Sequence, residues 1–156
     1  MTVLIDPSQQ LAQFRGMKTE RATAALPQTA AGALFTVTGG RLLLTGIIGE
    51  VTTVIQTQAD NTKLTFDPTD AGATQDLCAV LDITADAVGT MYSITGTPAT
   101  AMQDGLNFLS PNKVLAQAVI LKPGSILLDC AASNTGAVKW TAFWVPIDAT
   151  ARLAAA

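Results

Sequence analysis

The stretch from Leu34 to Gln56, LFTVTGGRLLLTGIIGEVTTVIQ, constrains the fold more than any other part of the sequence. It is dense in aliphatic and β-branched residues, and Phe35 and Val37 alternate with threonines as in a half-buried strand. Gly39 and Gly40 separate two apolar runs, where a two-residue turn needs the positive φ that glycine adopts without steric cost. The pattern predicts a β-hairpin whose second arm is a long strand.

Two further glycines, Gly46 and Gly49, interrupt this second arm. Glycine inside a strand marks a bulge or a corner, so we expect the strand to bend there. After Gln56, apolar runs alternate with turn residues, and almost nothing recurs at helical spacing. The strands predicted there are residues 63–66, 77–83, 91–94, 114–121, 125–130 and 137–145.

With the long hairpin, these segments make seven or eight short antiparallel strands. That number and spacing predict an all-β domain, a β-sandwich or jelly roll, over residues 29–156. Residues 97–111 form either a long surface loop or a loop with a one-turn helix near Ala99. The final segment, ATARLAAA, has no role that the sequence indicates.

Residues 1–28 differ from the rest, because they hold several charges and glutamines and few β-branched residues. We interpret them as an N-terminal arm, with a frayed terminus as the alternative. Pro7 fits the first position of a short helix that Asp6 would cap, and Leu11 and Phe14 would then share one face. Such a face suits docking on a neighbouring protein or on the parent domain. The candidate contact residues of the arm are Leu11, Phe14, Arg15, Lys18 and Arg21.

The composition is 49% hydrophobic and only 13% charged. A surface with so few charges indicates contacts with other protein chains. No apolar run approaches the length of about 18 residues that a membrane helix needs, so we expect no membrane association. The net charge of -3, with Lys and Arg scattered singly, argues against nucleic acid as a partner. The first ten residues lack the basic and apolar parts of a signal peptide, so we expect synthesis in a cytoplasm.

The sequence contains no histidine, which removes the commonest general base and the commonest metal ligand. We therefore expect no enzymatic activity and no cofactor. Asp60, Asp67, Asp70 and Asp76 lie in one loop-rich region and could offer oxygen ligands to calcium. Their sequence contexts are more typical of aspartates that hold turns.

The two cysteines and the two tryptophans lie in strand-like segments. Cys78 and Cys130 are interpreted as buried free thiols, with a disulfide as the alternative. Trp140 and Trp144 are four residues apart and would project to the same face of a strand. They would either fill the core or a subunit interface, or form a platform on which a sugar stacks.

The phrases TGGRLLLTGIIGEVTTVIQ and CAASNTGAVKWTAFWVPID resemble structural proteins of tailed-bacteriophage virions, and most of all capsid decoration (cement) proteins. The resemblance extends over roughly Leu26 to Asp148. It implies a non-catalytic β-sandwich, commonly a homotrimer, that sits on the capsid surface of the virion. Its partner would be the major capsid protein, whose neighbouring subunits it would tie together. The alternative is a tail, baseplate or fibre component that binds a glycan receptor.

Overall fold

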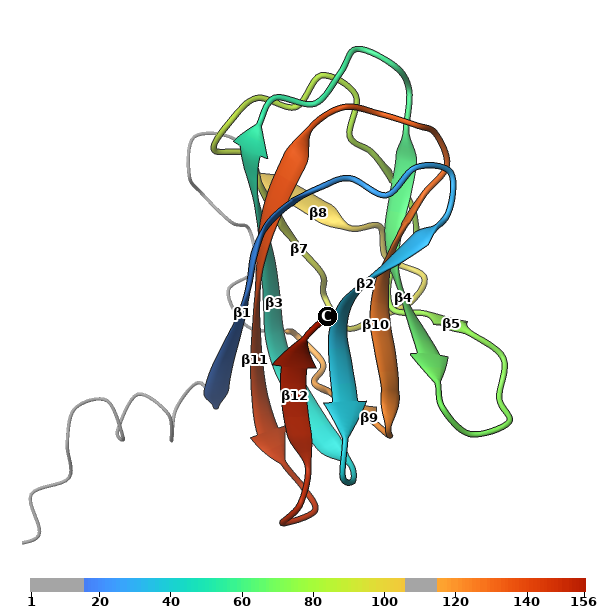
Figure 1. Ribbon diagram of the computed structural model, residues 1–156, viewed down its shortest axis with the longest axis vertical. Helices are drawn as coiled ribbons and strands as arrows, with labels where there is room; N and C mark the ends of the chain where they lie inside the picture. Colours follow the sequence, from blue (N-terminus) through green and yellow to red (C-terminus); the bar gives the residue numbers. More distant parts are fainter. Residues whose placement is uncertain (1–15, 106–114) are drawn as a thin grey trace, which may run out of the picture.

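The computed structural model describes residues 16–105 and 115–156, and these form two antiparallel β-sheets packed face to face (Figure 1). The predicted all-β sandwich is therefore confirmed, and the described residues form twelve strands in place of the seven or eight expected. The helix predicted from Pro7 to Phe14 lies outside the described residues.

The first sheet contains the two longest strands, and its strands follow one another in the order β1-β11-β3-β7-β8, with β9 also paired to β3. Its members are β1 (Met17–Ala25), β3 (Leu42–Thr53), β7 (Met91–Ser93), β8 (Gln103–Gly105), β9 (Val119–Leu121) and β11 (Ala137–Pro146).

The second sheet has the order β12-β2-β10-β4-β5, with β6 also paired to β4. Its members are β2 (Ala31–Thr38), β4 (Asn61–Pro68), β5 (Gln75–Asp76), β6 (Leu81–Asp82), β10 (Gly124–Cys130) and β12 (Arg152–Ala155). The C-terminal ATARLAAA thus does have a role, because β12 lies along β2 at one margin of this sheet.

The predicted hairpin is wrong, because β2 and β3 belong to different sheets and do not pair. Gly39 and Gly40 have φ of 72° and 145°, as a glycine turn requires, but the turn carries the chain across the sandwich. Phe35 and Leu42 are both fully buried, one from each sheet. Alternating apolar residues show only that one face of each strand must be buried. Two strands that face each other across the core meet this requirement as well as two strands that pair side by side.

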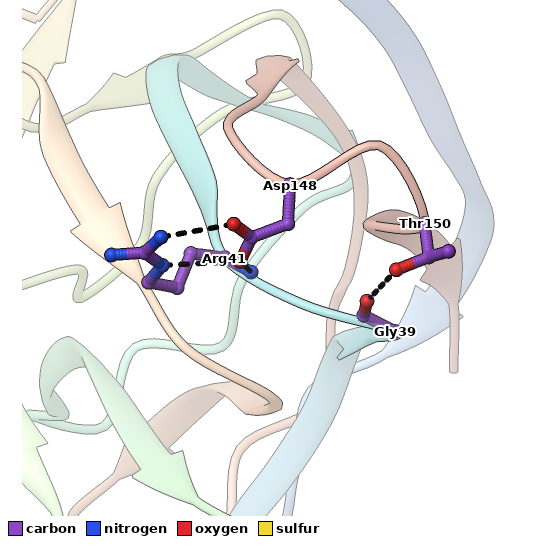
Figure 2. Close-up of polar contacts among 4 residues, drawn as sticks. All are labelled: Gly39, Arg41, Asp148 and Thr150. Carbon is purple, nitrogen blue, oxygen red and sulfur yellow. Dashed lines mark hydrogen bonds and ion pairs between the residues drawn. The ribbon is translucent and has the colours of Figure 1, made fainter.

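A second crossing lies at the same end of the sandwich, where the segment 147–151 joins β11 to β12. Figure 2 shows how the two crossing turns bind each other. Asp148 accepts hydrogen bonds from the Arg41 backbone N (2.7 Å), Nε (3.1 Å) and Nη2 (2.9 Å). Thr150 Oγ1 donates to the carbonyl oxygen of Gly39. The two connections between the sheets therefore hold each other in place.

The predicted arm of residues 1–28 is divided in the structure. Met17–Ala25 forms β1, which pairs with β11 from Met17 opposite Trp144 to Ala25 opposite Ala137. Trp144 Nε1 donates to Thr19 Oγ1 (3.0 Å), which in turn donates to the carbonyl of Leu153 (3.2 Å). β1 is thus an integral strand of the sandwich, and residues 1–15 lie outside the described residues.

The core is organised around the inward face of β11, where Val138, Trp140, Ala142 and Trp144 alternate with outward residues. The Trp140 ring covers Gly49 so closely that a Cβ there would come within 2.8 Å of it. The same ring stacks on Tyr92, with centroids 6.3 Å apart. Gly49 therefore provides space for the indole. The predicted bulge lies beside Gly46, where the register with β11 shifts by one residue.

Both margins of the sandwich are joined across the two sheets. On one side, β1 and β12 meet through the Thr19 bond to Leu153 and an Arg21 Nε bond to the carbonyl of Ala156 (3.4 Å). On the other, Ala79 exchanges backbone hydrogen bonds with Thr100 and Met102, ahead of β8. Joined margins leave fewer open strand edges for another chain to extend.

We predict that Thr19→Val lowers the free energy of unfolding by about 1 to 3 kcal/mol, because it leaves a buried Trp144 N–H without an acceptor. Thr23→Val on the exposed part of the same strand is the matched control, with an expected change within about 0.5 kcal/mol. Urea unfolding followed by tryptophan fluorescence measures both. Equal effects would mean that β1 is not held through Thr19.

A second prediction concerns the folding stability at acidic pH. The Arg41 side chain and backbone N–H lower the pKa of Asp148 from 3.8 to about 2. A lowered folded-state pKa adds stability that is complete above pH 3.8 and disappears as the pH falls to about 2. The stability difference between the wild type and Asp148→Asn should therefore be constant near neutral pH and shrink over that window. Parallel stability profiles would contradict this, and Asp70→Asn on an exposed loop is the control.

Candidate interaction face

The outward face of the first sheet carries a row of apolar side chains on three adjacent strands. Val145 of β11 lies opposite Leu43 of β3, and Leu43 lies opposite Ile120 of β9. Ile120 is 62% exposed and Val145 is 38% exposed, although both are large hydrophobic residues. We call Val145, Leu43 and Ile120 the apolar row.

Beside the apolar row, the same face is hollowed into a groove of about 260 Å³. Apolar and charged side chains share its lining, which consists of Lys18, Glu20, Ile48, Glu50, Met91, Lys139, Thr141 and Phe143. We call it the charged groove. Glu20 lies 3.3 Å from Lys18 Nζ and 3.6 Å from Lys139 Nζ. The hydrogen bond from Lys18 and the charge of Lys139 lower the pKa of Glu20, so this carboxylate stays ionised near neutral pH.

The outward face of the second sheet is different in character. Ser125 of β10 lies between Thr36 of β2 and Asp67 of β4 in the ladder, and Asp129 lies opposite Lys63. Lys63 is paired with Asp76 at 2.7 Å. Small polar and charged residues of this kind are compatible with water. The outward face of the first sheet therefore combines the exposed apolar row with the charged groove, and it is the candidate interaction face.

The structure brings only part of the predicted arm residues to this face. Lys18 lines the charged groove, whereas Arg21 points to the margin between the sheets and bonds to the carbonyl of Ala156. Leu11, Phe14 and Arg15 lie outside the described residues.

Trp140 and Trp144 share one face of β11, as their spacing predicts, and that face is the core. They are 1% and 3% exposed. Rings buried to this degree offer no surface on which a sugar could stack, so the geometry favours the core interpretation of this pair.

Three of the four aspartates considered as calcium ligands have separate structural roles. Asp60 is buried and accepts the Ala132 backbone N–H (3.0 Å), Asp67 accepts Thr74 Oγ1 (3.1 Å), and Asp76 pairs with Lys63. Within residues 16–105 and 115–156, no three His, Cys, Asp or Glu side chains gather as metal ligands.

Cys78 and Cys130 are free and buried, as predicted. Burial raises the pKa of both thiols, that of Cys130 to about 12. Since the thiolate is the reactive form, both groups are inert near neutral pH.

The sequence interpretation missed the apolar row. The signal was present in Leu42-Leu43-Leu44, because three consecutive apolar residues in a strand place an apolar side chain on both faces. The partners of Leu43, Val145 and Ile120, become recognisable only once the strand order is known.

Comparison of the chain with protein-family models, with curated proteins and with solved structures finds no match. The described part of the chain contains no helix with the length and apolar character needed to cross a membrane.

Proposed function

We propose that this chain is a non-catalytic structural protein of tailed-bacteriophage virions that decorates and cements the capsid. It would bridge neighbouring subunits of the major capsid protein on the virion surface, as a homo-oligomer for which a trimer is favoured. The proposal combines the resemblance of the sequence phrases to capsid decoration proteins with the one-sided surface of the sandwich.

The single observation that carries the proposal is the exposed apolar row on an otherwise folded, two-layered domain. Ile120, Leu43 and Val145 are presented together in register on three strands, which is the arrangement of a contact surface. Burying apolar area contributes about 25 cal/mol per Å², and the entropy lost on association offsets part of it. The binding free energy of a contact that is repeated at many positions on a shell adds up, even where each copy binds weakly.

The rest of the sandwich supports a mechanical role. The two crossing turns bind each other through Arg41 and Asp148, and both margins are joined across the sheets. A domain fixed in this way transmits a load between the surfaces it contacts.

Any test of the arm must delete residues 1–15 and spare β1, because Thr19 satisfies the indole N–H of Trp144.

The experiment that tests the proposal is a measurement of copy number. Purified particles of the phage or prophage that encodes this chain are quantified by mass spectrometry against the major capsid protein. We expect about one copy per major capsid subunit. A few copies per particle would favour a tail, baseplate or fibre component instead, and absence from particles would refute a virion role.

We further predict that Ile120→Asp reduces attachment to particles at least tenfold, because it places a charge in the apolar row, at a cost of about 1.4 kcal/mol or more per contact. Its free energy of unfolding should change by less than about 0.5 kcal/mol, since Ile120 is exposed. Val88→Asp is the matched control, since Val88 is 59% exposed but lies outside the row. Cosedimentation with particles stripped of this protein measures both, and equal binding by the two variants would refute the assignment of the face.

A further inference from the structure

We propose that the charged groove binds an arginine side chain of a partner protein, with Glu50 as the residue that holds the guanidinium group. The proposal deepens the proposed function, on which it rests only in taking this face as the one that meets a partner. It names the chemistry that such a partner must present. The basis of the argument is charge complementarity between the groove and a basic side chain.

Glu50 differs from the other charged residues of the groove. Lys18 and Lys139 both pair with Glu20, with distances of 3.3 Å and 3.6 Å between Nζ and the carboxylate. Among the residues that the structure describes, Glu50 has neither an ion pair nor a side-chain hydrogen bond. A half-buried carboxylate has lost part of its hydration, and here no hydrogen bond replaces it. Glu50 is therefore the charge in the groove that remains available to a ligand.

The order of the strands explains why Lys139 does not neutralise Glu50. Lys139 of β11 lies opposite Glu50 of β3, so their backbones are adjacent. Glu20, however, belongs to β1, which pairs with the other edge of β11 (Figure 1). The ammonium group of Lys139 is bound to Glu20 and is thus directed away from β3. The groove therefore has a positive side along β1 and β11 and a negative side at Glu50.

The floor of the groove beside Glu50 suits the stem of a long side chain. Ile48 is two residues from Glu50 on the same face of β3, a step of about 7 Å along the strand. Thr141 lies opposite Ile48, and Met91 lies opposite Glu50. All four side chains line the groove and are half-buried. The stem of an arginine, about three methylene groups long, would cover Ile48 and Met91 while its charged head reaches Glu50.

Arginine matches these features better than other ligands do. Its planar guanidinium forms parallel hydrogen bonds with a carboxylate, and it is more weakly hydrated than an ammonium group. A calcium ion takes about six to eight oxygen ligands, whereas Glu50 supplies one carboxylate beside apolar side chains. The groove volume of about 260 Å³ is below the range of about 300 to 1,000 Å³ that is typical of small-molecule pockets. A single side chain is therefore the occupant that fits.

NMR of the full-length chain, labelled with ¹³C in its methionine methyl groups, tests the proposal. Met91 lines the groove and reports binding, whereas Met102 is 1% exposed and serves as the internal control. Met91→Leu assigns the Met91 signal by removing it. The probe is N-acetyl-arginine amide. The matched neutral probe is N-acetyl-citrulline amide, in which an uncharged urea group of similar shape replaces the guanidinium.

We expect a saturable shift of the Met91 signal with the arginine probe, and about tenfold weaker binding of the citrulline probe, because the charge-assisted hydrogen bonds are lost. Glu50→Gln should weaken binding of the arginine probe by about tenfold for the same reason. Asp70→Asn, which removes a carboxylate from an exposed loop, is the matched control and should bind as the wild type does. The proposal would be overturned by the absence of a saturable shift, by equal binding of the two probes, or by equal binding to Glu50→Gln and the wild type.

Lys139→Gln tests the charge argument from the opposite side. This substitution removes a positive charge next to Glu50, so the arginine probe should bind at least as tightly as it does to the wild type. Weaker binding would show that Lys139 holds the probe and would overturn the assignment to Glu50. Since no particle is present in these titrations, their failure leaves the proposed virion role untouched. Conversely, absence of the protein from particles would not change the result of the titrations.

Discussion

The burial of Trp140 and Trp144 between the two sheets is the interaction on which the rest of the structure depends. Both indoles project from β11, the strand that pairs with β1 on one side and β3 on the other. Trp140 needs the space above Gly49 and stacks on Tyr92 of β7. Trp144 needs a hydrogen-bond acceptor and finds it in Thr19 of β1. Two side chains thereby fix the neighbours of β11 and the margin at which the sheets meet.

The sequence predicts the class of fold because strand periodicity and turn residues are local signals. It identifies β10 and β11 closely, and it indicates the bulge beside Gly46. It fails where the answer depends on distant residues. The Gly39-Gly40 turn has the same local chemistry in a hairpin and in a crossing between sheets, and the partner that fixes the crossing is Asp148, 107 residues from Arg41. The sequence interpretation assigns β1 to an arm. Lys18 and Glu20 are exposed, and nothing in the sequence around them indicates that Thr19 between them points inward.

The candidate face was less accessible to sequence reasoning than the fold. Alternation in KWTAFWV correctly places both tryptophans on one side, but only the presence of the second sheet shows that this side is the core. The apolar row draws one residue from each of three strands that are far apart in the sequence. Pairing in space therefore defines the face, and no contiguous motif contains it.

The place of β11 near the C-terminal end of the sequence affects how the chain is made. Trp144 and its acceptor Thr19 are 125 residues apart, so β1 leaves the ribosome long before its sheet neighbour β11 has been translated. Until then, β1 and β3 expose edges and apolar side chains that β11 will later cover. Pairing over such separations is slow, because the loop must close before any contact is gained. The nascent chain is thus the stage at which aggregation competes most strongly with folding, and a chaperone that shields β3 would act during that interval.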